Sequence, residues 1–300
     1  MFDLRDHVAS LTAVFLALVI GILVGVGISG RGFVDDTERR RLQGQISELE
    51  ASLAAARDQG QDLERRQTAA EEFVAGAYPV LVNDRLAGAG AVVLVVGSPD
   101  TTIDWVDRAL DEADARLLRM RALRVPLRMD DIQSTLSSRG ALGGYVGDEY
   151  VEDLGRDLGR ELVAGGSTPL WDVLERQLVL ERSGDSTLAA DAVVVVRSAA
   201  PQQGDTARFL AGLYSGLASA GEPVVGAEVS RVEEEESALP VFQRHRISTV
   251  DGVDTPVGRL ALVLLLAGAD PGDYGIRETA GDGILPPIEP LPAVTTVDGG

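Results

Sequence analysis

Three patterns of hydrophobic and polar positions follow one another along the 300 residues of this chain. The first is a run of roughly 22 uncharged, mostly apolar residues from Val8 to Ser29, which as a helix is long enough to cross a hydrocarbon core of about 30 Å. We therefore expect residues 1–30 to form a single transmembrane helix that anchors the protein in a membrane. A cleaved signal peptide is the alternative, because Gly27, Ile28 and Ser29 suit a cleavage site, but the run is longer than an ordinary signal sequence.

Small residues recur at every fourth position of this predicted helix, from Ala9 to Ser29. Residues four apart share one helix face, and in lipid a face of small residues lets two helices approach closely. We expect this face to pair with a second copy, unless the series only reflects the abundance of small residues in membrane helices. The predicted interface consists of Ala13, Ala17, Gly21 and Gly25.

The second pattern, from 31 to 79, is a polar helix with a narrow apolar seam. Its apolar side chains alternate steps of four and three residues, which is the heptad pattern of a coiled coil. Gly60 and Gln67 occupy seam positions, so we expect the helix to loosen there, and we expect Pro79 to end it. An amphipathic helix folded back on its own domain is the alternative. The seam begins with Leu42, Ile46, Leu49 and Leu53.

Both segments favour pairing with a second copy of the chain, so we expect a membrane-bound homo-oligomer, in the simplest case a dimer. The side of the membrane on which the C-terminal domain lies stays open. Arg31, Arg39, Arg40 and Arg41 follow the span and only Arg5 precedes it, which by the positive-inside rule places the C-terminal part in the cytoplasm. A long exported domain can override that count.

The third pattern, over residues 80–286, alternates strands with helices and predicts an α/β domain with a doubly wound, Rossmann- or flavodoxin-like sheet. Continuous runs of β-branched residues suit strands that are buried on both faces. The predicted strands are Ala91 to Gly97, Asp191 to Arg197 and Glu222 to Ala227. The predicted helices are Thr101 to Arg119, Asp205 to Ala220 and the short core helix Pro256 to Ala267. Residues 287–300, close to several prolines, are expected to be a disordered tail.

Composition excludes several function classes. The net charge of −20 argues against nucleic acid as a partner, because nucleic acid is itself a polyanion. The chain has no cysteine, so it has no disulfide, no thiolate nucleophile and no cysteine-based metal site. A solvated acidic surface accounts for the charge.

No sequence motif indicates catalysis. The loop after the first predicted strand, Gly97 to Asp100, has neither the three glycines of a dinucleotide site nor the lysine of a phosphate-binding loop. A group of four glycines lies away from any strand-to-helix junction and predicts a flexible loop. We therefore expect no enzyme activity and no cofactor. These glycines are Gly140, Gly143, Gly144 and Gly147.

Three polar features allow two interpretations each. Arg244 and Arg246 flank His245 and disfavour its charged form, so a surface position is favoured over a metal ligand. The acidic run Glu233 to Glu236 suits a solvated loop, with a hard-cation site as the alternative. Asp254 or Thr255 stands just before a proline and suits a helix N-cap, with a partner or ligand contact at that helix end as the alternative.

Motifs at both ends of the chain resemble the actinobacterial MctB-type copper transport proteins. One set begins at Leu4-Arg5-x-His7 and continues through Ser10 to Leu18 and Gly21-x-x-x-Gly25, and a second set lies near the C-terminus. The second set contains Ser248, Thr249, Asp251, Asp254, Thr255 and Gly258, followed by Ala261-Leu262-Val263, Tyr274-Gly275 and Leu285-Pro286.

The resemblance implies an envelope protein of copper homeostasis or export, described in the family as an outer-membrane channel-type component, and no enzyme. The residues themselves offer few copper ligands, since copper(I) prefers thiolates and thioethers and copper(II) prefers imidazoles. In the predicted domain the candidates are Met120, Met129 and His245. The alternative function is therefore an oligomeric scaffold that binds a protein partner of the envelope or division machinery and transports no metal.

Overall fold

The computed structural model describes residues 4–29 and 35–289, with side chains described in 10–26 and 38–289. Its contacts divide the chain into two compact units at residues 70 and 71. Most of the predicted disordered tail, from residue 290 on, lies outside the described residues.

The first unit holds helix α1, Leu4–Ser29, and most of helix α2, Asp35–Val82. Within the described residues, no helix has the length and apolar character needed to cross a membrane. Both ends of the predicted span, residues 8–9 and 27–29, lie outside the side chains described for α1. Open space surrounds the Cα atoms of Gly21 and Gly25 within the single chain, where a side chain would touch nothing. The anchor and its pairing face therefore stay predictions.

Helix α2 is continuous, which corrects two expectations. The helix does not loosen at Gly60 or Gln67, and it passes through Pro79 for one more turn, closed by a hydrogen bond from Asn83 N to Pro79 O of 3.1 Å. Val82 and Tyr78 on this last turn are buried in the second unit, and this packing holds the helix beyond the proline. The coiled coil itself stays a prediction. In the single chain its seam is exposed, at 53% for Leu42, 54% for Ile46, 67% for Leu49 and 50% for Leu53.

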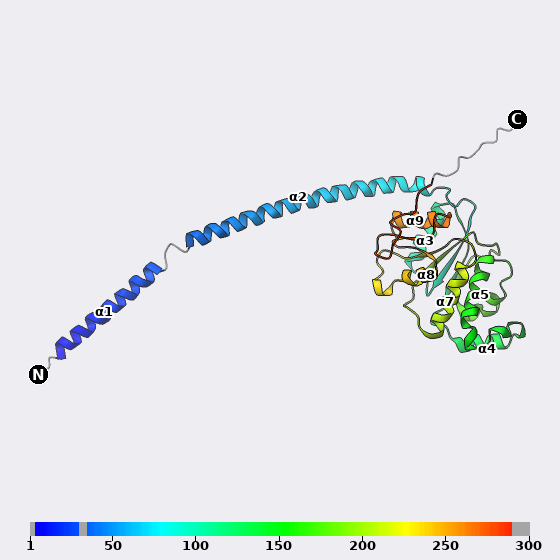
Figure 1. Cartoon of the computed structure of the whole chain (residues 1–300), viewed down its shortest axis with the longest axis horizontal. Coiled ribbons are helices and arrows are strands. Elements are labelled where there is room, and N and C mark those ends of the chain that lie inside the picture. The colour runs from blue at the N-terminus through cyan, green and yellow to red at the C-terminus, as the bar shows by residue number, and fades with distance from the viewer. Residues whose placement is uncertain (1–3, 30–34, 290–300) are drawn as a thin grey trace, which may run out of the picture. The chain divides into compact units, whose positions relative to one another are not determined.

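The second unit is an α/β domain, as predicted, and within the described residues its sheet has seven strands in the order β3-β2-β1-β4-β5-β6-β7. Figure 1 shows α3 and α9 over one face of this sheet and α5 and α7 over the other. The strands are β1 (Gly90–Val96), β2 (Arg116–Leu123), β3 (Val179–Ser183), β4 (Ala192–Arg197), β5 (Val224–Ala227), β6 (Ser248–Val250) and β7 (Asp273–Tyr274). The helices are α3 (Thr101–Glu112), α4 (Met129–Ser137), α5 (Val151–Ala164), α6 (Pro169–Leu178), α7 (Gly204–Ala218), α8 (Leu239–Arg244) and α9 (Pro256–Leu266), with 3-10 turns at Gly140–Tyr145, Asp148–Tyr150 and Glu234–Glu236.

The sheet is mixed rather than wholly parallel. Six strands run parallel, and β3 joins the edge of β2 antiparallel, with Arg121 opposite Arg182. Strands β1 and β4 occupy the centre and are buried along almost their whole length, which explains their unbroken apolar sequences. The three predicted strands are thus confirmed as β1, β4 and β5.

One predicted helix is too long by several residues. Asp100 caps α3 as its side chain accepts a hydrogen bond of 2.8 Å from Thr102 N, but the helix ends at Glu112. Asp114 takes a left-handed conformation with φ of 60°, which reverses the chain, and the next residues pair with β1 as strand β2. The segment contains good helix formers, and only its burial against β1 makes it a strand.

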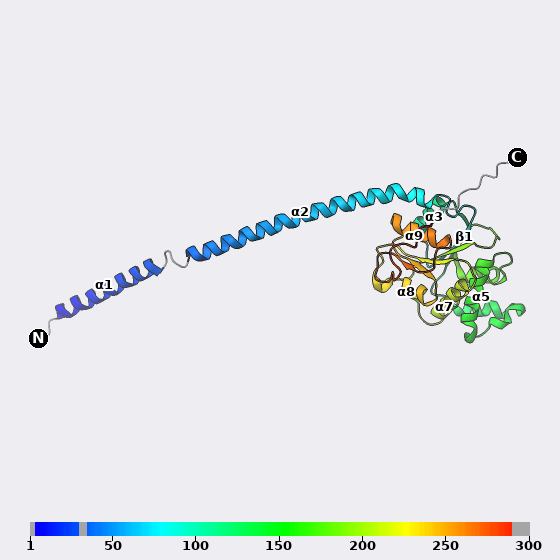
Figure 2. The same cartoon turned by 45° about the horizontal axis from the view of Figure 1, so that its top comes forward.

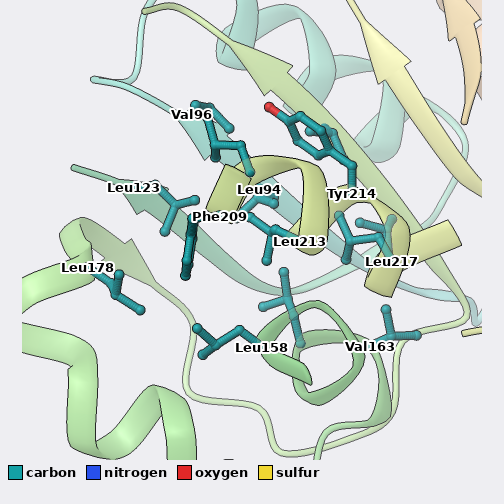
Figure 3. Close-up of a cluster of buried hydrophobic side chains, with 14 of the residues drawn as sticks. Leu94, Val96, Leu123, Leu158, Val163, Leu178, Phe209, Leu213, Tyr214 and Leu217 are labelled. Carbon is teal, nitrogen blue, oxygen red and sulfur yellow. The ribbon is translucent and has the colours of Figure 1, made fainter. Parts of the chain in front are cut away.

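Two apolar clusters cover the two faces of the sheet. One is formed with α5, α6 and α7, and Figure 3 shows Leu94, Val96 and Leu123 of the strands against Phe209 and Leu213 of α7. The other is formed with α3, α9 and the end of α2, and it contains most of α9, so this helix is core as predicted. Figure 2 shows the same two layers of helices from a second direction.

Helices α5 and α7 approach each other through glycines. Gly155 and Gly159 lie four residues apart on α5, and Gly212 and Gly216 lie four apart on α7. A Cβ atom added at Gly159 would lie 2.5 Å from the carbonyl oxygen of Leu213, and one added at Gly212 would overlap the carbonyl of Glu152. Close helix packing over small residues, which we expected in the membrane segment, is thus present inside the domain.

Candidate functional site

The C-terminal ends of the parallel strands meet at one edge of the sheet, where ligands bind in many doubly wound domains. At the switch point between β1 and β4 the two following loops touch each other. The Ser198 hydroxyl donates a 2.5 Å hydrogen bond to the carbonyl of Ser98, and a Cβ atom at Gly97 would lie 2.6 Å from the Ser198 Oγ. This place is therefore filled by the chain itself.

Farther along the same edge, the loops after β5, β6 and β7 form a buried polar cluster. Glu228 follows β5 directly and is 4% exposed, and Asp251 follows β6 directly and is 2% exposed. We call the cluster the carboxyl-edge network. It consists of Glu228, Ser230, Asp251, Asp254 and Arg277.

Asp251 organises the turn after β7. Its carboxylate accepts hydrogen bonds of 3.0 Å from Ile276 N and 2.9 Å from Arg277 N. Gly275 has a φ of 145°, and a side chain there would overlap the Asp251 carboxylate. Only glycine allows the turn to close over the buried acid.

Arg277 and Glu228 form the ion pair of the network. The distance from Arg277 Nη1 to Glu228 Oε2 is 3.1 Å, and the other Arg277 nitrogen donates to the carbonyls of Ser230 at 3.0 Å and Val232 at 2.6 Å. The second oxygen of Glu228 accepts a hydrogen bond of 2.9 Å from Ala238 N. The pair therefore joins the loop after β5 to the loop after β7.

Asp254 holds the loop after β6 to the loop after β5. It accepts hydrogen bonds of 2.7 Å from both the backbone nitrogen and the hydroxyl of Ser230. Burial raises the pKa of Asp254, but the two bonds from Ser230, with the backbone N–H of Asp254 and the charge of Arg231, outweigh this effect and hold the pKa below its usual value.

The cap of α9 is Thr255, as one of the two candidates predicted, and Asp254 is not the cap. The Thr255 hydroxyl oxygen accepts a hydrogen bond of 3.1 Å from Gly258 N, and Pro256 begins the helix. Gly258 packs against the backbone of Gly252, so the chain covers this helix end. Strand β6 is tied to β7 in the same way, because the Thr249 hydroxyl donates to Asp273 at 2.7 Å and the Ser248 oxygen accepts from Gly272 N at 3.2 Å.

The six residues of the C-terminal motif thus lie on β6, in the loop that leads to α9 and in the first turn of α9. Sequence reasoning missed three partners that complete the arrangement, namely Glu228, Arg277 and the buried Arg259 of α9. Arg259 lies over the ring of Tyr78 at 5.1 Å and its Nε is 3.6 Å from Glu112 Oε2. The position of Glu228 directly after a predicted strand was the available signal for one of them.

The carboxylates of the network are occupied by donors of the chain, so they act as a framework for the loops. Among the described residues, no group of three or more histidine, aspartate or glutamate side chains is arranged to hold a metal ion. The run Glu233 to Glu236 is exposed, and its last three residues form the 3-10 turn Glu234–Glu236. The Glu236 carbonyl of this turn accepts a hydrogen bond of 2.6 Å from Arg197. The described geometry therefore favours the solvated loop over the cation site.

The candidate copper ligands lie in separate places. Met120 is buried in β2 on the α9 side of the sheet, whereas Met129 begins α4 and packs on the opposite side. His245 Nδ1 lies 3.1 Å from the Ser215 hydroxyl. Burial lowers the pKa of His245, and the charge of Arg244 lowers it further, so the predicted direction is confirmed but its main cause is burial.

A family model described as "Copper transport outer membrane protein, MctB" matches residues 1–285 of the chain. Among curated proteins, those named "Copper transporter MctB" from Mycobacterium bovis and from two strains of Mycobacterium tuberculosis are similar to it. Each is 27% identical over 315 residues, and the alignment covers 92% of this chain and 96% of the relative. The similarity therefore extends over both compact units.

Proposed function

Because the chain belongs to the MctB family of copper transport proteins, we propose that it is an envelope-anchored accessory component of copper transport, which does not carry the metal on ligands of its own domain. The family expected from the terminal motifs is confirmed. The envelope location follows the family description, and the single N-terminal anchor over Val8 to Ser29 is part of the proposal. Copper is the cargo of the process in which this chain takes part.

The positions of the potential copper ligands are the observation that carries the accessory role. A tight copper(I) site needs two or more soft ligands that converge on one point. The sheet separates Met120 from Met129 and His245, and the His245 ring is engaged with Ser215. These three donors cannot share one ion in this fold, which favours a role through other proteins.

Helix α2 supports an oligomer as the working form. Its seam side chains are at least half exposed in the single chain, and a second helix would remove them from water. The steps of four and three put Ile46 and Leu53 at a positions and Leu42 and Leu49 at d positions. Ile46 at a with Leu49 at d is the combination that favours parallel two-stranded coils. We therefore propose a parallel dimer through α2, in which Ala13, Ala17, Gly21 and Gly25 form the pairing face of α1.

Copper tolerance of cells that carry defined variants tests the accessory role. The double change Leu49→Asp and Leu53→Asp places four charges in the proposed dimer seam and should abolish copper tolerance. The control Ala51→Asp and Ala55→Asp adds the same charge to the outer face of the helix and should leave tolerance intact. The triple change Met120→Leu, Met129→Leu and His245→Gln should also leave it intact. A copper-sensitive triple variant with a tolerant seam variant would contradict the proposal.

Cysteine cross-linking in membranes tests the dimer directly, because the chain has no native cysteine. A single cysteine at Leu49 should give cross-linked dimers, and one at Ala55 should give few. Equal cross-linking at both positions would contradict a defined seam, even if copper tolerance behaves as expected.

A further inference from the structure

A cavity of about 200 Å³ lies beside α6 and over β2 and β3, the two strands at one lateral end of the sheet. It is unusual for this acidic protein because three arginines line it. They are Arg119, Arg121 and Arg182.

Strand pairing places these like charges together. Arg121 and Arg182 are directly opposite each other on the antiparallel strands β2 and β3. Arg119 lies two residues before Arg121, so both side chains leave β2 on the same face. Like charges directly opposite across two strands destabilise a sheet unless a counter-charge lies near them.

Among the described residues, only one of the three arginines contacts a carboxylate directly. Arg182 forms an ion pair of 2.6 Å with Glu175. Arg119 is 4% exposed and donates to the carbonyls of Ser186 at 3.1 Å and Leu188 at 2.8 Å, which are uncharged acceptors.

Arg121 likewise donates to a carbonyl, that of Met120, at 3.0 Å. Neither Arg119 nor Arg121 forms an ion pair with a carboxylate of the described residues. Burial lowers the pKa of both arginines, and in each case a neighbouring arginine lowers it further, whereas Glu175, Asp185 and Asp172 act on the pKa of Arg121 in the opposite direction.

The N-terminus of α6, beside the cavity, already has its donors occupied by the chain. The first nitrogens of α6 are taken by Glu161, whose carboxylate accepts from Leu170 N at 3.1 Å and from Trp171 N at 3.3 Å. Polar groups complete the wall of the cavity at Gly166, Thr168 and Thr187, and open space lies beside the Gly166 Cα atom. The cavity therefore combines two guanidinium groups that contact no carboxylate directly with hydroxyls and free volume.

We propose that this cavity binds a small tetrahedral oxyanion, a phosphate group, held by Arg121 and Arg182 above the buried Arg119. Guanidinium groups bind phosphate oxygens in pairs, which gives strength and direction. The volume accommodates one phosphate group with a few waters, since a water occupies about 30 Å³ in the liquid. Asp172, Glu175 and Asp185 also line the cavity, and their charge opposes every anion that the arginines attract, most strongly a large polyanion.

Calorimetric titration of the full-length protein in detergent, at low chloride, tests this with inorganic phosphate and with glycerol phosphate as probes. The wild type should bind at least one of them at a single site. Arg121→Gln should weaken that binding about tenfold or more, the usual value of a charge-assisted hydrogen bond. Arg116→Gln, an exposed change at the start of the same strand, should leave it within about twofold because solvent screens this charge.

A further variant keeps the test decisive if Arg121→Gln does not fold. Glu175→Gln removes the carboxylate that competes for Arg182 and should tighten binding. A preference for glycerol phosphate would identify a phosphate monoester as the ligand, and a preference for inorganic phosphate would identify the free ion. Absence of saturable binding to both probes, equal loss in Arg116→Gln, or weaker binding in Glu175→Gln would overturn the proposal.

Discussion

Replacing Gly159 by alanine should destabilise the domain, although alanine is the better helix former. In an isolated helix this change would contribute up to about 1 kcal/mol of stability. In the structure, the new Cβ atom would lie 2.5 Å from Leu213 O and 2.9 Å from Leu217 N. An ordinary contact between carbon and carbonyl oxygen is about 3.3 Å, so the helices must separate locally by roughly 0.8 Å.

The separation is costly because the contacted atoms are backbone, which no side-chain rotation can move. Moving α5 from α7 also loosens the packing of buried neighbours such as Leu158 and Leu217. Overpacking of this kind costs about 1–3 kcal/mol, and subtracting a helix gain of about 1 kcal/mol leaves a net loss of up to roughly 2 kcal/mol. For a domain of this size the unfolding midpoint should fall by up to about 8 °C.

Thermal unfolding of the full chain, followed by tryptophan fluorescence, measures this effect. Trp171 is a suitable reporter because its ring nitrogen donates a 2.9 Å hydrogen bond to Leu158 O on α5. Gly212→Ala should lower the unfolding midpoint more than Gly159→Ala does, since its Cβ atom would overlap the Glu152 carbonyl. Gly76→Ala is the matched control, because nothing lies near that helical glycine and its midpoint should not fall. A Gly159→Ala midpoint at or above the wild type would refute the reasoning.

Two further predictions concern charged groups. Arg277→Met should lower the free energy of unfolding by about 3 kcal/mol in urea titrations, because the buried Glu228 loses its ion-pair partner. Adding Glu228→Gln should recover part of this loss. A loss below about 1 kcal/mol in the single variant would contradict the role of the pair. The folded-state pKa of His245 lies below its unfolded value of about 6.5, so the unfolded chain binds the proton first and stability should fall as pH drops from 7 through 6.5 towards the lowered pKa. His245→Gln should remove this part of the pH dependence, and an unchanged pH profile would show that another group causes it.

The sequence alone determined the α/β class and the central strands. Strands β1 and β4 are unbroken runs of valine and similar residues, and such runs fit only positions that are covered on both faces. The sequence also indicated the cap and the core position of α9, because Thr255-Pro256 is a local signal and the helix is apolar on every side apart from Arg259. The family was also recognisable, since ordered motifs survive in both end segments.

Only the tertiary structure decided where less regular segments belong. Arg116 to Leu123 contains good helix formers, and it became a strand because β1 offered a partner edge. The antiparallel strand β3 is largely exposed and therefore carries little apolar pattern of its own. Pro79 lies inside a helix because the buried turn after it is held by the domain core.

The polar sites depended most on three-dimensional placement. Glu228, Asp251 and Arg277 are far apart in sequence, and parallel pairing of β5, β6 and β7 brings their loops to one edge. The opposition of Arg121 and Arg182 is set by strand register alone, which no local pattern announces. Local composition could thus specify which segments are buried. The partners of a buried charge follow from long-range strand pairing, because hydrogen bonds and ion pairs depend on distances that the linear order of residues does not contain.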